Sequence, residues 1–111
     1  MTKKSFLLIT FIVSLLMTTT VSADAKKGQK YYLKKLKACK KDGFENGAFF
    51  ALKHSREEWE QLKSDNELVT KWTTMCPSAE KRFTNMKERE IKNFYDFVWK
   101  YASDGDIPSC G

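Results

Sequence analysis

The chain has 111 residues, 20 basic and 14 acidic side chains, and a formal net charge of +6 at pH 7. Eight lysines and no acidic residue lie between Lys26 and Lys41, whereas the chain from Asp42 onward carries a slight acidic excess. Nucleic acid is a poor partner for this charge, because the basic run contains no arginine and no nucleic-acid-binding motif is present. A chain of this length predicts one small domain.

Residues 1–23 have the composition of a cleavable secretory signal. Two lysines precede an apolar run over residues 6–17, and the segment ends on the small residues Val21-Ser22-Ala23. The run is shorter than the roughly 20 residues needed to cross a bilayer, so we expect cleavage and no stable membrane anchor. The predicted mature domain covers residues 24–111 and lies in the periplasm, where disulfides can form.

The mature sequence predicts an all-α fold, because no stretch alternates apolar and polar residues as a strand does. We expect the first helix over residues 27–40, ending at Gly43. Its apolar stripe consists of Tyr32, Leu33, Leu36 and Cys39. The other side is a lysine face of Lys30, Lys34, Lys37 and Lys41. This face is either a solvated surface or a docking site for an acidic redox partner, anionic lipid headgroups or polyanions.

The middle of the chain predicts shorter helices. Residues 47–54 are expected to form one or two helical turns. Three apolar side chains of this segment are expected to be partly buried: Phe49, Phe50 and Leu52. Ser55-Arg56-Glu57-Glu58 is a capping box that opens the next helix. Ser64 or Asp65 is expected to cap the helix after it, and Pro77 to end that helix.

The C-terminal helix has the strongest pattern. A start signal lies at Thr84 or Asn85, and apolar residues from Ile91 to Ala102 recur at i, i+3, i+4 and i+7 over nearly five turns. Ser103-Asp104-Gly105 is expected to end it. The mature domain therefore contains about four predicted helices.

Three cysteines, Cys39, Cys76 and Cys110, each lie at or beyond the predicted end of a helix. Three cysteines allow one disulfide and leave one thiol. We favour Cys76–Cys110, which would hold the C-terminal tail, over Cys39–Cys110, while Cys39–Cys76 and three free thiols are the remaining alternatives. Such a bond stabilises a small domain by roughly 3–4 kcal/mol.

No enzyme class is indicated, because the chain lacks C-x-x-C, a glycine-rich phosphate loop, G-x-S-x-G and H-E-x-x-H. We therefore assign no catalytic residue. His54, the sole histidine, is either a polar residue at a helix entry or a haem or metal ligand. Met75 and Met86 are either core residues or sulfur ligands. A catalytic pair of His54 with Cys39, 15 residues away, is disfavoured.

The two ends of the domain resemble class I cytochrome c. That family opens with a helix of the form Gly-x-x-x-Tyr ahead of its haem-binding cysteines, and closes with a long aromatic helix that packs across the first. Here the segment from Gly28 to Cys39 is similar to the opening, and the segment from Met86 to Ala102 to the closing helix. The resemblance implies a cytochrome-c-like bundle with crossing N- and C-terminal helices. A plain four-helix bundle is the alternative.

Small secreted bacterial proteins described as cytochrome-c-like are similar in three further segments: Lys53-His54-Ser55-Arg56-Glu57-Glu58-Trp59, Met75-Cys76-Pro77 and Pro108-Ser109-Cys110. Cytochrome c attaches haem through C-x-x-C-H. With Cys39 as the first cysteine, Asp42 and Gly43 replace the second cysteine and the histidine. With Cys39 as the second, Leu36 and Lys40 replace the first cysteine and the histidine. The usual covalent attachment is therefore absent.

These observations favour a non-enzymatic periplasmic binding or accessory protein with a cytochrome-c-like fold and no covalent haem. It would dock a protein partner, for example a redox protein, through its lysine face or its aromatic surface. The alternative is a periplasmic electron carrier with unusual haem ligation through His54 or a single thioether at Cys39. A second alternative is a thiol-redox factor that uses the unpaired cysteine.

Overall fold

The computed structural model describes residues 24–107; the predicted signal peptide and Cys110 lie outside this range. Within it every regular element is helical, which confirms the all-α prediction. A helix over residues 24–35, the N-terminal helix, comes first. The elements after it are η1 (Lys37–Asp42), α2 (Gly47–Ala51), α3 (Arg56–Ser64), α4 (Leu68–Met75), η2 (Pro77–Ala79), α5 (Glu80–Thr84) and α6 (Glu88–Lys100). None of the helices in residues 24–107 has the length and hydropathy required to cross a membrane.

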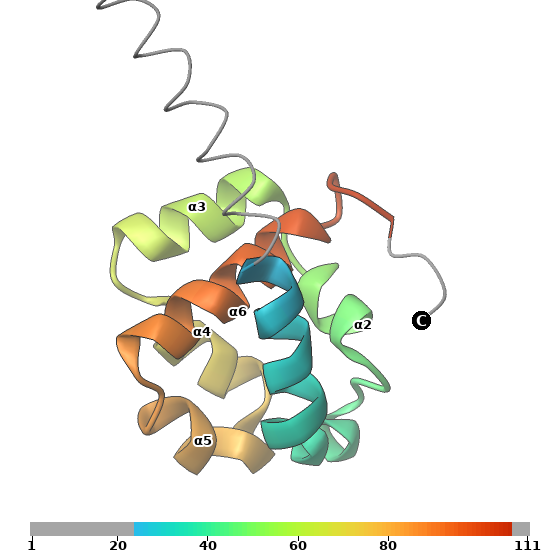
Figure 1. Ribbon diagram of the computed structural model, residues 1–111, viewed down its shortest axis with the longest axis vertical. Helices are drawn as coiled ribbons and strands as arrows, with labels where there is room; N and C mark the ends of the chain where they lie inside the picture. Colours follow the sequence, from blue (N-terminus) through green and yellow to red (C-terminus); the bar gives the residue numbers. More distant parts are fainter. Residues whose placement is uncertain (1–23, 108–111) are drawn as a thin grey trace, which may run out of the picture.

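The N-terminal helix lies across α6 (Figure 1). Gly28 marks the contact, because a Cβ placed there would lie 2.2 Å from the carbonyl oxygen of Asn93 and 2.7 Å from Cβ of Phe97. These distances leave no room for a side chain, so glycine allows the two backbones to approach closely. The first and last helices of the domain are therefore in direct contact at Gly28.

Aromatic side chains fill the interior around this crossing. The ring centroid of Phe94, in the middle of α6, lies 4.8 Å from that of Trp72 and 5.5 Å from that of Phe50. All three side chains are fully buried. Ring pairs in tilted or edge-to-face geometry contribute about 0.5–1.5 kcal/mol each beyond the burial of their area. Phe94 lies on the apolar stripe that predicts α6, and this stripe faces the core.

The first helix ends earlier than predicted. The N-terminal helix ends at residue 35, Leu36 interrupts it, and the 3-10 helix η1 follows. Leu36 and Cys39 are both fully buried. Residues three apart lie on one side of a 3-10 helix, so the tighter turn directs both side chains into the core. Gly43 ends the segment with a φ of 95°, as predicted.

A disulfide joins Cys39 to Cys76, with their Cα atoms 5.4 Å apart. The favoured pairing Cys76–Cys110 is therefore wrong, and so is Cys39–Cys110, because each requires a sulfur that is already bonded. Pro77 stops α4 after Met75, and the chain turns at Cys76 toward η1. Pro77 allows the end of α4 to be predicted from the sequence, but nothing in the sequence indicates the direction in which the chain turns at Cys76.

The capping box at the start of α3 is confirmed. The amide of Glu58 donates to Ser55 Oγ at 3.2 Å, and the amide of Ser55 donates to Glu58 Oε1 at 2.8 Å. The predicted cap at Ser64 or Asp65 is wrong, because α3 continues through Ser64 and α4 begins at Leu68 without a side-chain cap. Asn66, with a φ of 59°, forms the turn instead.

Residues 77–84 contain η2 and α5, which the sequence analysis did not assign. The expected helix start at Thr84 or Asn85 is wrong, because α5 ends at Thr84 and α6 begins at Glu88. Glu90 marks the true start, since its Oε1 accepts the Lys87 amide at 2.9 Å. Phe83 explains the intervening helix, because α5 places this side chain in the core at 1 % exposure.

Candidate functional site

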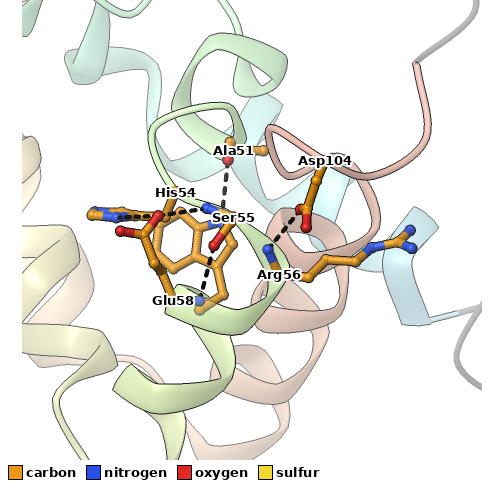
Figure 2. A network of polar contacts seen from close by, with 7 residues as sticks. Ala51, His54, Ser55, Arg56, Glu58 and Asp104 are labelled. Atoms are coloured by element: carbon orange, nitrogen blue, oxygen red, sulfur yellow. Dashed lines mark hydrogen bonds and ion pairs between the residues drawn. The ribbon is translucent and has the colours of Figure 1, made fainter.

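His54 lies where the start of α3 meets the end of α6 (Figure 2). Its ring packs edge-on against Trp59, with centroids 4.8 Å apart, and Nδ1 lies 3.6 Å from Oε1 of Glu58. Its carbonyl accepts the amide of Ser103 at 3.0 Å. The side chain is 19 % exposed. His54 thus contributes to a helix junction, in agreement with its interpretation as a polar residue at a helix entry.

Arg56 fixes the same junction, and the sequence analysis did not single it out. Its amide donates to Asp104 Oδ1 at 2.8 Å (Figure 2). Its guanidinium donates to the carbonyls of Trp99 and Lys100 at 3.0 and 3.2 Å. These carbonyls belong to the last turn of α6, where they also accept the amides of Ala102 and Asp106 at 3.4 and 2.8 Å, so Arg56 adds a charged donor to each. Its guanidinium also lies 4.0 Å from the Trp99 ring centroid.

The candidate haem donors do not form a haem site in the described residues. The sulfur of Cys39 is in the disulfide and offers no thiol for a thioether. Met86 is 9 % exposed and belongs to the core, and Met75 is a partly buried residue that packs against the core. The His54 ring contacts Trp59. No group of three or more His, Cys, Asp or Glu side chains within residues 24–107 is placed to hold a metal ion. These residues do not fit a haem or metal centre.

Basic side chains gather instead over two adjoining surface depressions. The first, about 470 Å³, is lined by Lys34, Lys35, Lys37, Lys81 and Arg82 together with Glu80 and residues of η2. The second, about 490 Å³, shares Lys35, Lys81 and Arg82 and adds Lys87 and Glu90. We call the two together the basic groove, with six cations: Lys34, Lys35, Lys37, Lys81, Arg82 and Lys87. All six are exposed.

The basic groove is formed by two segments that are distant in the sequence. One is the end of the N-terminal helix with η1, and the other runs from η2 to the N-cap of α6. The buried Cys39–Cys76 disulfide joins them directly. Beside it, Asp42 accepts the amide of Ser78 at 3.0 Å and the hydroxyl of Ser78 at 3.1 Å. These links hold like charges together on a rigid support.

Tyr31 lies in the wall of the second depression. Its hydroxyl donates to the Arg82 carbonyl at 3.5 Å. Burial, and then the nearby carboxylate of Glu90, raises the pKa of Tyr31. The hydroxyl is protonated at neutral pH, and its hydrogen bond to Arg82 ties the N-terminal helix to α5.

The predicted lysine face contributes to the basic groove in part. Lys34 and Lys37 line it, whereas Lys30 and Lys41 are exposed but are not among the lining residues. The sequence analysis did not identify four cations of the basic groove. One, Lys35, is in the first segment, and three are in the second: Lys81, Arg82 and Lys87. Three of these lie in a charge-balanced stretch among Glu80, Glu88 and Glu90, so charge counting along the chain carries no signal for them.

Comparison with known proteins does not assign the chain to a family. No protein-family model matches it, and neither curated proteins nor solved structures provide a match. The function must therefore be argued from the geometry of this molecule and from the chemistry of its surface. The basic groove brings six cations from two distant segments together.

Proposed function

We propose that this domain is a non-enzymatic periplasmic binding protein that docks an acidic protein partner on the basic groove. The observation that supports the proposal is the convergence of six cations from two segments that a buried disulfide and the Asp42–Ser78 hydrogen bonds hold together. Fixed charges of one sign attract a partner of the opposite sign and orient it during the encounter. Rigid placement of the cations reduces the entropy that binding must overcome.

A cytochrome-c-like fold without haem remains part of this proposal. The close crossing of the N-terminal helix and α6 at Gly28 supports it. An electron carrier is disfavoured, because Cys39 is bonded and aromatic rings occupy the interior. The thiol-redox hypothesis depends on Cys110, which lies outside the described residues.

Polyglutamate is a suitable probe for the acidic partner, because it carries carboxylates on a polypeptide backbone. We expect binding that weakens as the ionic strength rises from about 0.01 M to about 0.15 M, since the screening length then falls from about 30 Å to about 8 Å. Isothermal titration calorimetry measures both affinities. Binding that does not change over this range of salt would contradict an electrostatic groove.

A matched pair of variants separates the groove from net charge. The groove variant is Lys34→Gln/Lys35→Gln/Lys81→Gln/Arg82→Gln. The control variant removes four exposed cations that do not line the groove: Lys26→Gln/Lys27→Gln/Lys41→Gln/Arg89→Gln. Exposed ion pairs contribute about 0.2–1 kcal/mol each, so the groove variant should bind polyglutamate about tenfold more weakly or worse. An equal loss in the control variant would mean that net charge alone attracts the probe, and the proposed docking site would be withdrawn.

A further inference from the structure

A second surface of the domain carries large apolar side chains in contact with solvent. Leu33 is 59 % exposed, Phe49 49 % and Leu52 46 %. The sequence analysis expected Phe49 and Leu52 to be partly buried, and the structure leaves about half of each side chain exposed. Isolated exposed apolar residues are ordinary, whereas several on one face indicate an interaction surface.

These three side chains belong to elements that pack against each other. A Cβ at Gly47, the first residue of α2, would lie 3.3 Å from Cδ1 of Tyr32 on the N-terminal helix, so the two helices are in contact. A depression of about 420 Å³ is lined by both Leu33 and Asn46. The Asn46 side chain in turn accepts the amide of Phe49 at 3.1 Å.

Leu52 follows Phe49 by three residues and keeps helical backbone angles, so the two side chains lie on the same side of α2. Leu33 on the N-terminal helix and Phe49 and Leu52 at α2 are thus exposed apolar side chains of two elements in contact, and we call the three together the apolar patch. The fold places this surface on the N-terminal helix and α2, two neighbouring elements in Figure 1.

Three lysines neighbour members of the apolar patch, and one of them, Lys37, also lines the basic groove. Lys37 and Lys40 line the same depression as Leu33, where Glu45 is the acidic member. Lys53 directly follows Leu52, and its Nζ lies 5.7 Å from the ring centroid of Phe44. These long side chains can lie along apolar surface while their ammonium groups remain in water.

We propose that the apolar patch binds an anionic lipid surface, with Leu33, Phe49 and Leu52 entering the headgroup region and the neighbouring lysines contacting lipid phosphates. Leucine and phenylalanine bordered by lysine is the composition of interfacial membrane-binding surfaces. The cores of protein–protein interfaces are also enriched in aromatic residues, phenylalanine included, but they are depleted in lysine. A second copy of the chain is disfavoured, because its lysines would face these lysines.

The test uses the processed protein and two kinds of vesicle, one of pure phosphatidylcholine and one containing phosphatidylcholine and phosphatidylglycerol in equal amounts. Co-sedimentation measures the fraction bound. We expect binding to the anionic vesicles, at least about tenfold weaker binding to the neutral ones, and loss of binding at high ionic strength. Equal binding to both kinds of vesicle would overturn the proposed role of the lysines.

Substitutions test the apolar contacts. The Leu33→Ser/Phe49→Ser variant should bind anionic vesicles about tenfold more weakly, because two partly inserted side chains are lost. The Ile107→Ser variant removes a side chain that is 92 % exposed elsewhere and should bind within about twofold of the unchanged protein. Both variants should retain their helical circular dichroism, because the substituted residues lie outside the core.

Two results would replace this proposal with another occupant. If Leu33→Ser/Phe49→Ser leaves vesicle binding unchanged but abolishes polyglutamate binding, the apolar patch belongs to a protein-docking surface. If it abolishes concentration-dependent self-association, the occupant is a second copy. Loss of vesicle binding in the groove variant alone would assign the lipid contact to the basic groove. The docking function of the groove and the lipid function of the patch therefore fail separately.

Discussion

Removing the disulfide by Cys39→Ala/Cys76→Ala should destabilise the domain strongly. The bonded residues are 37 positions apart, and the chain-entropy model gives about 4 kcal/mol for a loop of this length. A domain of this size has a free energy of unfolding of about 4–13 kcal/mol, so the loss is a large part of the total. Each kcal/mol shifts the Tm of such a domain by about 4–8 °C. We therefore expect the Tm to fall by about 15–30 °C.

Thermal unfolding followed by far-ultraviolet circular dichroism measures this shift. A matched control is Cys110→Ser, which removes the third cysteine and should leave the Tm unchanged. If Cys110→Ser lowers the Tm while Cys39→Ala does not, the pairing is not the one in the structure. A Tm of the double variant within about 5 °C of the unchanged protein would refute the entropic reasoning.

Three further changes test the packing and the ionisation of the core. Gly28→Ala should lower the free energy of unfolding by about 2–3 kcal/mol in a denaturant titration, because the new Cβ would meet the Asn93 carbonyl. Arg56→Met should lower it by about 2 kcal/mol, because two carbonyls at the end of α6 lose a charged donor. Burial raises the pKa of Tyr32 and of Tyr95 to about 12. Their contribution to the free energy of unfolding is therefore fully present below pH 10 and is lost as the pH rises from 10 to about 12. A pH titration of tyrosinate absorbance should show two late tyrosines that ionise as the helices unfold.

These expectations have specific controls. Arg89→Met removes an exposed arginine on α6, the helix whose terminal carbonyls Arg56 contacts, and should leave the stability within about 0.5 kcal/mol of the unchanged protein. A Gly28→Ala variant of unchanged stability would mean that the two helices separate at little cost. If all four tyrosines ionise near pH 10 without unfolding, Tyr32 and Tyr95 are more hydrated than their 5 % and 8 % exposure indicates.

Local signals in the sequence predict local structure well. The Ser55–Glu58 capping box depends on four adjacent residues, and it forms as predicted. The long apolar period of α6 is a property of one segment, and it predicts both the helix and its buried face. Gly43 adopts the left-handed conformation that its place after a helix suggests. Each of these features depends only on residues that are close together in the sequence.

Features that depend on distant segments were not predictable in this way. The helix breaks at Leu36, three residues before Cys39 bonds to Cys76, and nothing within residues 24–43 indicates either feature. Pairing of three cysteines is equally undetermined, since every pair closes a loop of plausible length. The basic groove depends on the same long-range contacts, because the disulfide and the Asp42–Ser78 hydrogen bonds bring the segment with Lys81 and Arg82 beside the lysines of the first segment.

The two proposed surfaces differ in their dependence on the disulfide, and this difference connects the stability prediction to function. The basic groove needs η1 and η2 to be joined, and Cys39–Cys76 joins them. The apolar patch rests on Tyr32 packed against Phe50, with ring centroids 6.0 Å apart, and needs no contact with η2. In Cys39→Ala/Cys76→Ala, kept below its Tm, polyglutamate binding should therefore fall while vesicle binding persists. Joint loss with intact helical circular dichroism would show that one surface, not two, binds both probes.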